Sequence, residues 1–156
     1  MKHLAFIIII LISLVACSHI DVYEKTAAIP SQAWYYNYIP SFSFTITDTL
    51  AVYNIYIVLR HTDAYEYNNI WLRLGTQAPG SDIHFQNLDI VLGSDAKGWE
   101  GHGTDDIFEV RKNITRGPVP FKKSGTHTFA INQIMRENPL KHVLNVGIRV
   151  EKVGHQ

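Results

Sequence analysis

Apolar and polar residues alternate along most of this chain with a period of two, the pattern of strands that bury one face. The alternation is clearest at residues 42–47, where Phe42, Phe44 and Ile46 are separated by serine and threonine. Comparable runs predict six further strands, at residues 55–60, 70–75, 85–92, 107–114, 126–131 and 144–152.

Two local features modify this strand pattern. Gln86-Asn87 interrupts the run 85–92 and predicts a bulge there. Residues 133–138 alone suggest a helix, of one or two turns, that ends at Pro139.

Turn-forming residues separate the predicted strands, among them Asp48-Thr49, Pro79-Gly80, Gly93-Ser94 and Gly117-Pro118. Short strands joined by such turns are typical of an all-β antiparallel sandwich. We therefore expect a β-sandwich, either jelly-roll or immunoglobulin-like, with one short helix.

The first residues have the pattern of a secretion signal. Lys2 precedes an apolar stretch from Leu4 to Leu14, which is shorter than the roughly 20 residues of a membrane-spanning helix. The stretch ends in Leu14-Val15-Ala16-Cys17, which resembles the lipobox of bacterial lipoproteins. Cleavage before Cys17 would leave its thiol at the new N-terminus, where it accepts a diacylglycerol.

Cys17 is the only cysteine, so the chain cannot form an internal disulfide. A lone thiol beside a cleavage site is explained by lipidation, and several acyl chains would make the anchor effectively permanent. The alternative is an ordinary signal peptide that ends next to a cysteine. We predict a signal peptide at residues 1–16, a lipidated tether at 17–30 and a sandwich domain at 31–153.

Charge and composition exclude several partners. The formal net charge is zero and no basic stripe is present, so nothing indicates nucleic-acid binding. Aromatic residues make up 12% and charged residues only 18% of the chain, which favours a folded domain over disorder.

The loop at residues 97–106 concentrates the unusual residues: Trp99, Gly101, Gly103, Asp105 and Asp106. An exposed Trp99 would stack on a sugar, with the two aspartates bonding its hydroxyls, or it would contact a protein. Alternatively, Trp99 folds back and caps the core. The glycines do not form a phosphate loop, because no lysine follows them at the required spacing.

Other chemistry is not indicated. The eight histidines occur singly, without the spacing of a metal site, so we expect no metal. We also expect no cofactor, and a small-molecule ligand is not indicated. No GxSxG motif is present and the cysteine is assigned to lipid. The tyrosines near Trp34 and around Glu66 form two aromatic patches, which either fill an open end of the sandwich or anchor an interface.

Several stretches in this order resemble a known family, the gliding-motility lipoprotein GldH of Bacteroidetes. The strongest are Tyr53-Asn54-Ile55-Tyr56-Ile57-Val58-Leu59-Arg60 and Gly125-Thr126-His127-Thr128-Phe129 leading into Gln133-Ile134-Met135-Arg136. Weaker ones are Ile29-Pro30 with Trp34, Gly98-Trp99 with Gly101 and Gly103, and Leu144-Asn145-Val146-Gly147-Ile148-Arg149-Val150-Glu151.

The resemblance implies a non-enzymatic lipoprotein of the cell envelope, on the inner or outer membrane, that supports gliding and the associated secretion apparatus. Its partners would be the bilayer, through Cys17, and other envelope proteins. Under the same assignment, Asp48-Thr49-Leu50 is similar to the short O-glycosylation pattern of exported proteins in that phylum, with Thr49 as acceptor. Two other hypotheses remain, a carbohydrate-binding surface lipoprotein and, ranked last, a metal-dependent hydrolase.

The substitution Cys17→Ala should abolish lipid attachment, because no other thiol is present. Cells fed labelled palmitate should label the wild-type protein and not the variant, and only the wild type should sediment with membranes. A Cys17→Ala protein that still carries the label would refute the assignment.

Overall fold

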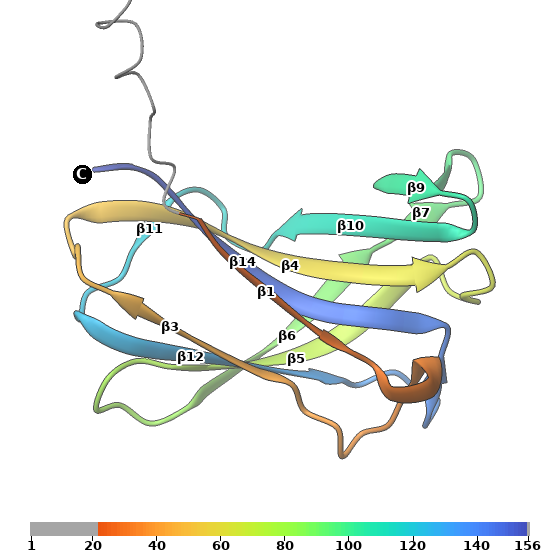
Figure 1. Ribbon diagram of the computed structural model, residues 1–156, viewed down its shortest axis with the longest axis horizontal. Coiled ribbons are helices and arrows are strands. Elements are labelled where there is room, and N and C mark those ends of the chain that lie inside the picture. Colours follow the sequence, from red (N-terminus) through yellow and green to blue (C-terminus); the bar gives the residue numbers. More distant parts are fainter. Residues whose placement is uncertain (1–21, 156) are drawn as a thin grey trace, which may run out of the picture.

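A computed structural model describes residues 22–155, which form two antiparallel sheets packed face to face (Figure 1). The first sheet has the order β1-β14-β4-β10-β9, and β11 pairs with the other end of β4. Its strands are β1 (Val22–Ala28), β4 (Ala51–Thr62), β9 (His102–Thr104), β10 (Ile107–Asn113), β11 (Val119–Pro120) and β14 (Val143–His155).

The second sheet has the order β3-β12-β5-β6. Its strands are β3 (Ser41–Ile46), β5 (Asn69–Gln77), β6 (His84–Val91) and β12 (Gly125–Gln133). Short strands complete the fold in two pairs, β2 (Ala33–Trp34) with β13 (Leu140–Lys141) and β7 (Gly93–Ser94) with β8 (Gly98–Trp99). One 3-10 turn, η1, spans Pro30–Gln32.

The strand order distinguishes between the two expected sandwiches. Among the eight longer strands, the first pairs with the last, the second with the seventh, the third with the sixth and the fourth with the fifth. This nested set of antiparallel pairs is the jelly-roll arrangement, not the immunoglobulin one. The predicted all-β antiparallel sandwich is confirmed.

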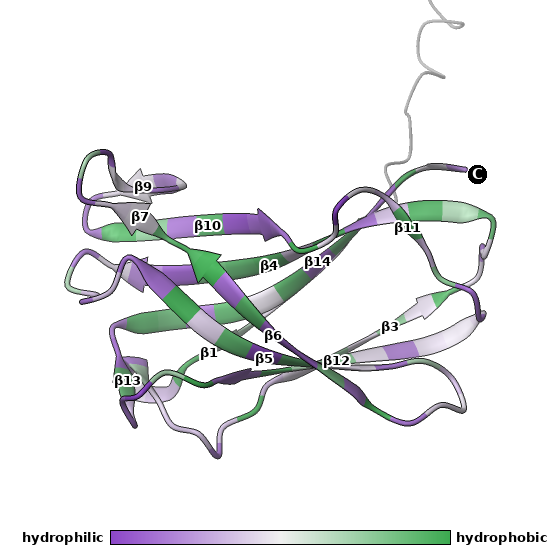
Figure 2. Cartoon of the chain, turned by 180° about the vertical axis from the view of Figure 1, so that it is seen from behind, coloured by the Kyte–Doolittle hydropathy of each residue, from purple (hydrophilic) through white to green (hydrophobic). Residues whose placement is uncertain are grey.

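The core follows from the period-two pattern. β3 alternates exposed and buried residues throughout, and along β5 hydrophobic and hydrophilic residues alternate (Figure 2). The inward side chains of both sheets form one hydrophobic cluster, which includes Trp34, Ile57, Leu72, Ile131 and Ile148.

β1 lies unusually close to β14 at Gly147. A Cβ atom there would lie 2.3 Å from the backbone oxygen of Lys25, so only glycine permits this approach. β1 therefore belongs to the sandwich. The predicted tether, which extended to residue 30, was too long, because residues 22–28 pair with β14. Cys17 and the signal peptide lie outside the described residues.

Two further predictions were wrong. No helix forms at residues 133–138: Gln133 ends β12 and turns follow it. The pairing of β5 with β6 runs without interruption from Asn69–Val91 to Thr76–His84, so Gln86-Asn87 makes no bulge.

Gln133 explains why a chain reversal rather than a helix forms here. Its buried side chain donates hydrogen bonds to the backbone oxygens of Trp34 (3.1 Å) and Glu137 (3.0 Å) and accepts one from the Met135 N–H (2.8 Å). These bonds fix the chain reversal after β12 and connect it to β2.

The sandwich has two ends. At the near end β1 begins and the chain finishes, beside the segments 47–50, 78–83, 114–124 and 152–155 (Figure 1). At the far end lie the segments 29–40, 63–68, 92–106 and 134–142.

The substitution Gln133→Leu should lower the free energy of unfolding by about 2 to 4 kcal/mol, because one buried and two partly buried backbone groups would lose their partner. Urea unfolding measures this. Thr126→Val, at an exposed position of the same strand, is the control and should stay within about 0.5 kcal/mol of wild type. Equal stability of Gln133→Leu and wild type would show that the bonds contribute little.

Candidate functional site

The far end carries a short aromatic and acidic segment, Tyr65-Glu66-Tyr67, which follows β4. A hollow of about 300 Å³ lies on one side of it and another of about 320 Å³ on the other. These three residues line both hollows, so the segment stands as a ridge between them.

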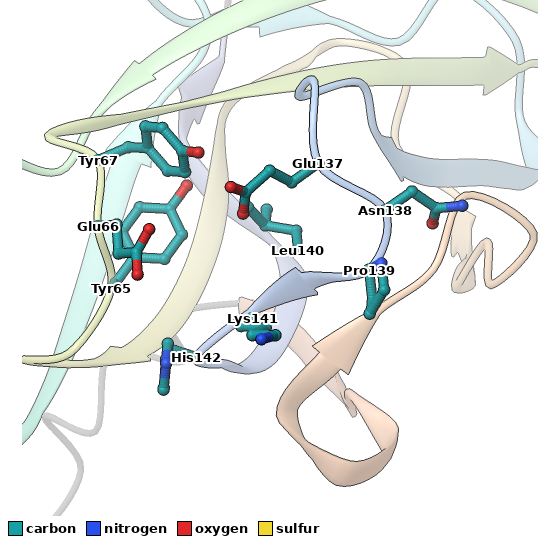
Figure 3. Close-up of a pocket in the computed structure, with 9 residues that line it drawn as sticks. All are labelled: Tyr65, Glu66, Tyr67, Glu137, Asn138, Pro139, Leu140, Lys141 and His142. Carbon is teal, nitrogen blue, oxygen red and sulfur yellow. The ribbon is translucent and has the colours of Figure 1, made fainter.

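The first hollow faces the reversal that follows β12. Its other wall is formed by residues 137–142, which include Glu137, Lys141 and His142 (Figure 3). The hydroxyl groups of Tyr65 and Tyr67 point toward the Glu137 carboxylate (Figure 3).

Hydrogen bonds hold the ridge in place. The Tyr67 hydroxyl bonds to the Glu137 carboxylate, and this bond raises the pKa of Tyr67. The Tyr65 hydroxyl donates to the Asn69 backbone oxygen at 3.0 Å, and burial raises the pKa of Tyr65 strongly. Both phenols are therefore neutral hydrogen-bonding groups at physiological pH.

An aromatic cluster packs against Tyr65 of the ridge. The imidazole of His61 lies 4.6 Å from the Trp99 ring, edge to face, and 5.5 Å from the Tyr65 ring. The Phe108 ring stacks with the imidazole at 5.8 Å. Such contacts add to the free energy of burial. They place Trp99 against the core, as in the capping alternative, while part of it still lines the second hollow.

His61 is fully buried in this cluster. Its Nδ1 bonds to the Thr62 backbone oxygen at 2.8 Å, and its Nε2 has no partner among the described residues. Since a carbonyl only accepts, Nδ1 carries the proton. Burial lowers the pKa of His61, so the imidazole is neutral at pH 7.

The glycines of the predicted interaction loop serve its packing. Gly101 has φ +92°, and a Cβ atom there would lie 2.1 Å from the Glu109 backbone oxygen. The loop is thus pressed onto β10, and the Glu100–Lys112 ion pair joins the same two elements. Gly103 packs against the Phe108 ring.

Asp105 and Asp106 do not join Trp99. They lie in the β9–β10 turn and line a separate hollow of about 320 Å³ with Arg60, His102 and Glu109. The structure therefore does not assemble the predicted combination of a stacking indole and two hydroxyl-binding aspartates.

Thr49 lies at the near end, in the partly exposed turn between β3 and β4. The adjacent Asp48 carboxylate accepts bonds from Lys152 at 2.8 Å and His155 at 3.0 Å, and Lys152 holds the pKa of Asp48 well below its usual range. Glycosylation of Thr49 stays a prediction.

The tyrosines of the segment 29–40 add to the far end. The Tyr36 hydroxyl donates to the Met135 backbone oxygen at 2.7 Å, which joins this segment to the reversal that lines the first hollow. Tyr35 and Ile39 are about half exposed, at 50% and 52%. Of the two roles expected for the aromatic patches, Tyr65 fills the end of the sandwich, whereas Tyr35 faces solvent.

The far end is acidic. The far-end segments contain seven carboxylates and three basic residues, a net charge of −4. The carboxylates are Asp63, Glu66, Asp95, Glu100, Asp105, Asp106 and Glu137, and the basic residues are Lys97, Arg136 and Lys141.

The wall formed by residues 137–142 was not predicted from the sequence. A helix was expected just before Pro139, so Glu137 and Lys141 were not placed opposite the tyrosines. The available signal was the turn-forming pair Asn138-Pro139, which separates Glu137 from Leu140-Lys141.

Within residues 22–155, no helix is long and apolar enough to cross a bilayer. Over the same range, no group of three or more histidine, cysteine, aspartate or glutamate side chains is arranged to hold a metal ion.

The fold is that of a jelly-roll domain whose far end is aromatic and acidic. Residues 21–150 match the family model described as "GldH lipoprotein", and the chain belongs to this family. The resemblance inferred from the sequence motifs is thereby confirmed.

Two relatives match over most of their length. One is "Gliding motility lipoprotein GldH homolog" of Christiangramia forsetii, 28% identical over 144 residues, which cover 88% of this chain and 87% of the relative. The other is "Gliding motility lipoprotein GldH" of Flavobacterium johnsoniae, 25% identical over 158 residues, or 97% of each chain.

Among solved structures, "Structure of infectious bursal disease virus Gx strain" is similar with a TM-score of 0.38 at 14% identity. The match covers 88% of this chain and 33% of the viral one, so the chain spans about a third of that protein. This likeness is too weak to carry any argument.

Stability should decrease as the pH falls below 6.5. The unfolded chain protonates His61 near that value, whereas burial keeps the folded imidazole neutral to lower pH. The loss from this residue should approach about 1.4 kcal/mol per pH unit between the unfolded and folded pKa values. Urea unfolding at several pH values measures it.

His61→Phe should flatten this dependence, since phenylalanine does not titrate and suits the aromatic cluster. His102→Phe, at an exposed position of β9, is the matched control and should keep the wild-type slope. An unchanged slope in His61→Phe would show that another group is responsible.

Proposed function

We propose that this protein is a membrane-anchored, non-enzymatic lipoprotein of the cell envelope that supports gliding motility and the associated secretion apparatus. The observation that carries the proposal is membership of the GldH lipoprotein family over nearly the whole domain. The sequence around Cys17 supports the lipid anchor, on the inner or the outer membrane and facing the periplasm or the surface.

The chemistry of the far end supports binding rather than catalysis. The titratable groups that line its ridge and support it are engaged with one another or with the core: Tyr67 bonds to Glu137, and His61 lies among aromatic rings. These arrangements give the ridge a fixed shape. A fixed, partly apolar surface is suited to protein contact, because little conformational entropy is lost on binding.

The far end also indicates the character of its partner. Tyrosine is enriched at protein interfaces, and Tyr35, Tyr36 and Tyr67 gather here. The net charge of −4 favours a partner with a basic surface. The partner we propose is an envelope protein that presents basic residues to the ridge and its two hollows.

A carbohydrate-binding role is the alternative, and one observation favours it: Trp99 and Tyr67 line the second hollow beside Asp95. Aromatic rings and carboxylates are the groups that bind sugars. Glycan-array binding that is lost in Tyr67→Ala, with the fold intact, would support this role over protein contact.

Deletion of the gene in a gliding strain should stop colony spreading and reduce secretion. The wild-type gene should restore both. A gene carrying Tyr35→Asp and Ile39→Asp should not, because the exposed contact surface would gain two charges. Thr126→Asp, on the exposed side of β12, is the control and should restore spreading. Normal spreading of the deletion strain would refute the proposal.

A photoreactive amino acid at Tyr35 should crosslink in living cells to an envelope protein. The same amino acid at Thr126 should give no adduct. Mass spectrometry of the adduct identifies the partner, and adducts at Thr126 alone would place the interface on the sheet instead.

A further inference from the structure

The near end of the sandwich combines three features: the start of β1, exposed apolar side chains and basic residues. We infer that this end lies on the lipid bilayer, with the far end directed away from it. The inference rests on the lipid anchor of the proposed function, and it adds a defined orientation of the domain.

The length of chain before β1 limits the distance to the membrane. Cys17 precedes Val22 by five residues, which span at most about 18 Å when fully extended. A chain of that length holds the near end within reach of the headgroups. The two ends are about 40 Å apart, since β4 has 12 residues, so the far end cannot approach as closely unless the domain lies on its side.

Apolar side chains project at this end. Leu50 is 69% exposed, Val153 is 45% exposed and Val22 is 37% exposed. The strand register places all three at the same end of the first sheet, because Val22 pairs with Glu151 and Ala51 pairs with His155. Leucine and valine at this corner can insert among the headgroups, as the apolar face of an interfacial segment does.

Basic side chains lie at the same end, on the side of β4 away from β14. Arg116 and Lys122 are exposed, and neither forms an ion pair with a carboxylate of residues 22–155. They belong to the segment whose strand β11 pairs with the start of β4. Lys123 donates to Ser81 and thus keeps its charge at the same end.

The acidic residues at the near end do not cancel this charge. Its four segments contain four basic residues and two carboxylates, Asp48 and Asp82, for a net charge of +2. Asp48 is already bonded to Lys152 and His155. An anionic membrane surface therefore attracts the near end and repels the far end, whose net charge is −4.

The orientation explains the position of the contact surface. With Leu50 and Lys122 at the headgroups, the Tyr65-Glu66-Tyr67 ridge faces the aqueous side, where an envelope protein can reach it. The bilayer itself would occupy the near end.

Depth-dependent fluorescence quenching tests the orientation on the complete, lipidated mature protein. Cys17 is the sole cysteine and its thiol is acylated, so Leu50→Cys or Tyr35→Cys provides a single site for a dye. The proteins are reconstituted in vesicles of phosphatidylglycerol and phosphatidylethanolamine that contain spin-labelled lipid. The Leu50→Cys dye should be strongly quenched, and the Tyr35→Cys dye should be quenched no more than free dye.

Charge reversal provides a second arm with a matched control. In the Leu50→Cys background, Arg116→Glu and Lys122→Glu together should reduce quenching, since each basic residue lost weakens the docked state by about fivefold. Arg136→Glu and Lys141→Glu make the same charge change at exposed far-end positions and should leave quenching unchanged. Circular dichroism confirms that each variant is folded.

The outcomes separate the two proposals. A protein that floats with the vesicles but shows equal quenching at both positions, or stronger quenching at Tyr35→Cys, retains the anchor and overturns the orientation. A protein that does not float overturns the anchor, and the orientation with it. Quenching at Leu50→Cys that arises equally without vesicles would indicate self-association and would also overturn the orientation.

Discussion

The antiparallel pairing of β14 with both β1 and β4 is the constraint on which the rest of the structure depends. β4 and β14 pair from Ala51–His155 at the near end to His61–Val143 at the far end. β1 adds to the free side of β14, closely enough that Gly147 has no room for a side chain. Residues that begin the domain are thus fixed to its last strand, and the two ends are held apart.

This pairing gives the domain its polarity. Because β1 starts at the near end, an anchor a few residues earlier must attach there. The loops of the far end then carry the groups suited to contact, with the ridge supported by His61, Tyr65, Trp99 and Phe108. In the proposed orientation, the jelly roll is a rigid spacer between the bilayer and a partner, and the proposed function requires no chemistry from it.

The outer face of the first sheet differs from the ends. On the first sheet, Glu24 accepts bonds from Arg149 at 2.8 Å and Arg111 at 3.0 Å, and Arg111 pairs with Glu109 at 2.9 Å. Each exposed pair contributes little to stability, about 1 kcal/mol or less. Together these pairs leave that face polar, with its charges compensated. The net charges of the two ends, in contrast, are not compensated.

Much of the fold was predictable from sequence, because alternation reports which face of a strand is buried. For this reason the strands predicted at 55–60, 70–75 and 126–131 fall within observed strands, and the one at 42–47 exceeds β3 by a single residue. β1 (Val22–Ala28) was not predicted as a strand, because it is an edge strand that is largely exposed on both faces and shows no alternation.

The candidate site was less predictable. The helix expected at 133–138 is replaced by a reversal that Gln133 connects to Trp34, a residue distant in sequence, and no local pattern reports such a bond. The concentration of glycines beside Trp99 in the loop 97–106 was visible in the sequence. The packing of those glycines against β10 depends on tertiary contacts that the sequence does not show. Family membership was recoverable because its motifs are strand segments and turns that persist in order.

Hydrogen exchange on the lipidated protein tests the central claim, that opposite ends of one rigid domain contact bilayer and partner. Exchange is compared for protein on vesicles and for protein purified from cells in its native complex. The account predicts protection of residues 47–50 and 114–124 by vesicles, and added protection of residues 63–68 and 134–142 in the complex. Protection confined to β5, β6 and β12 in the complex, with residues 63–68 and 134–142 unchanged, would contradict it.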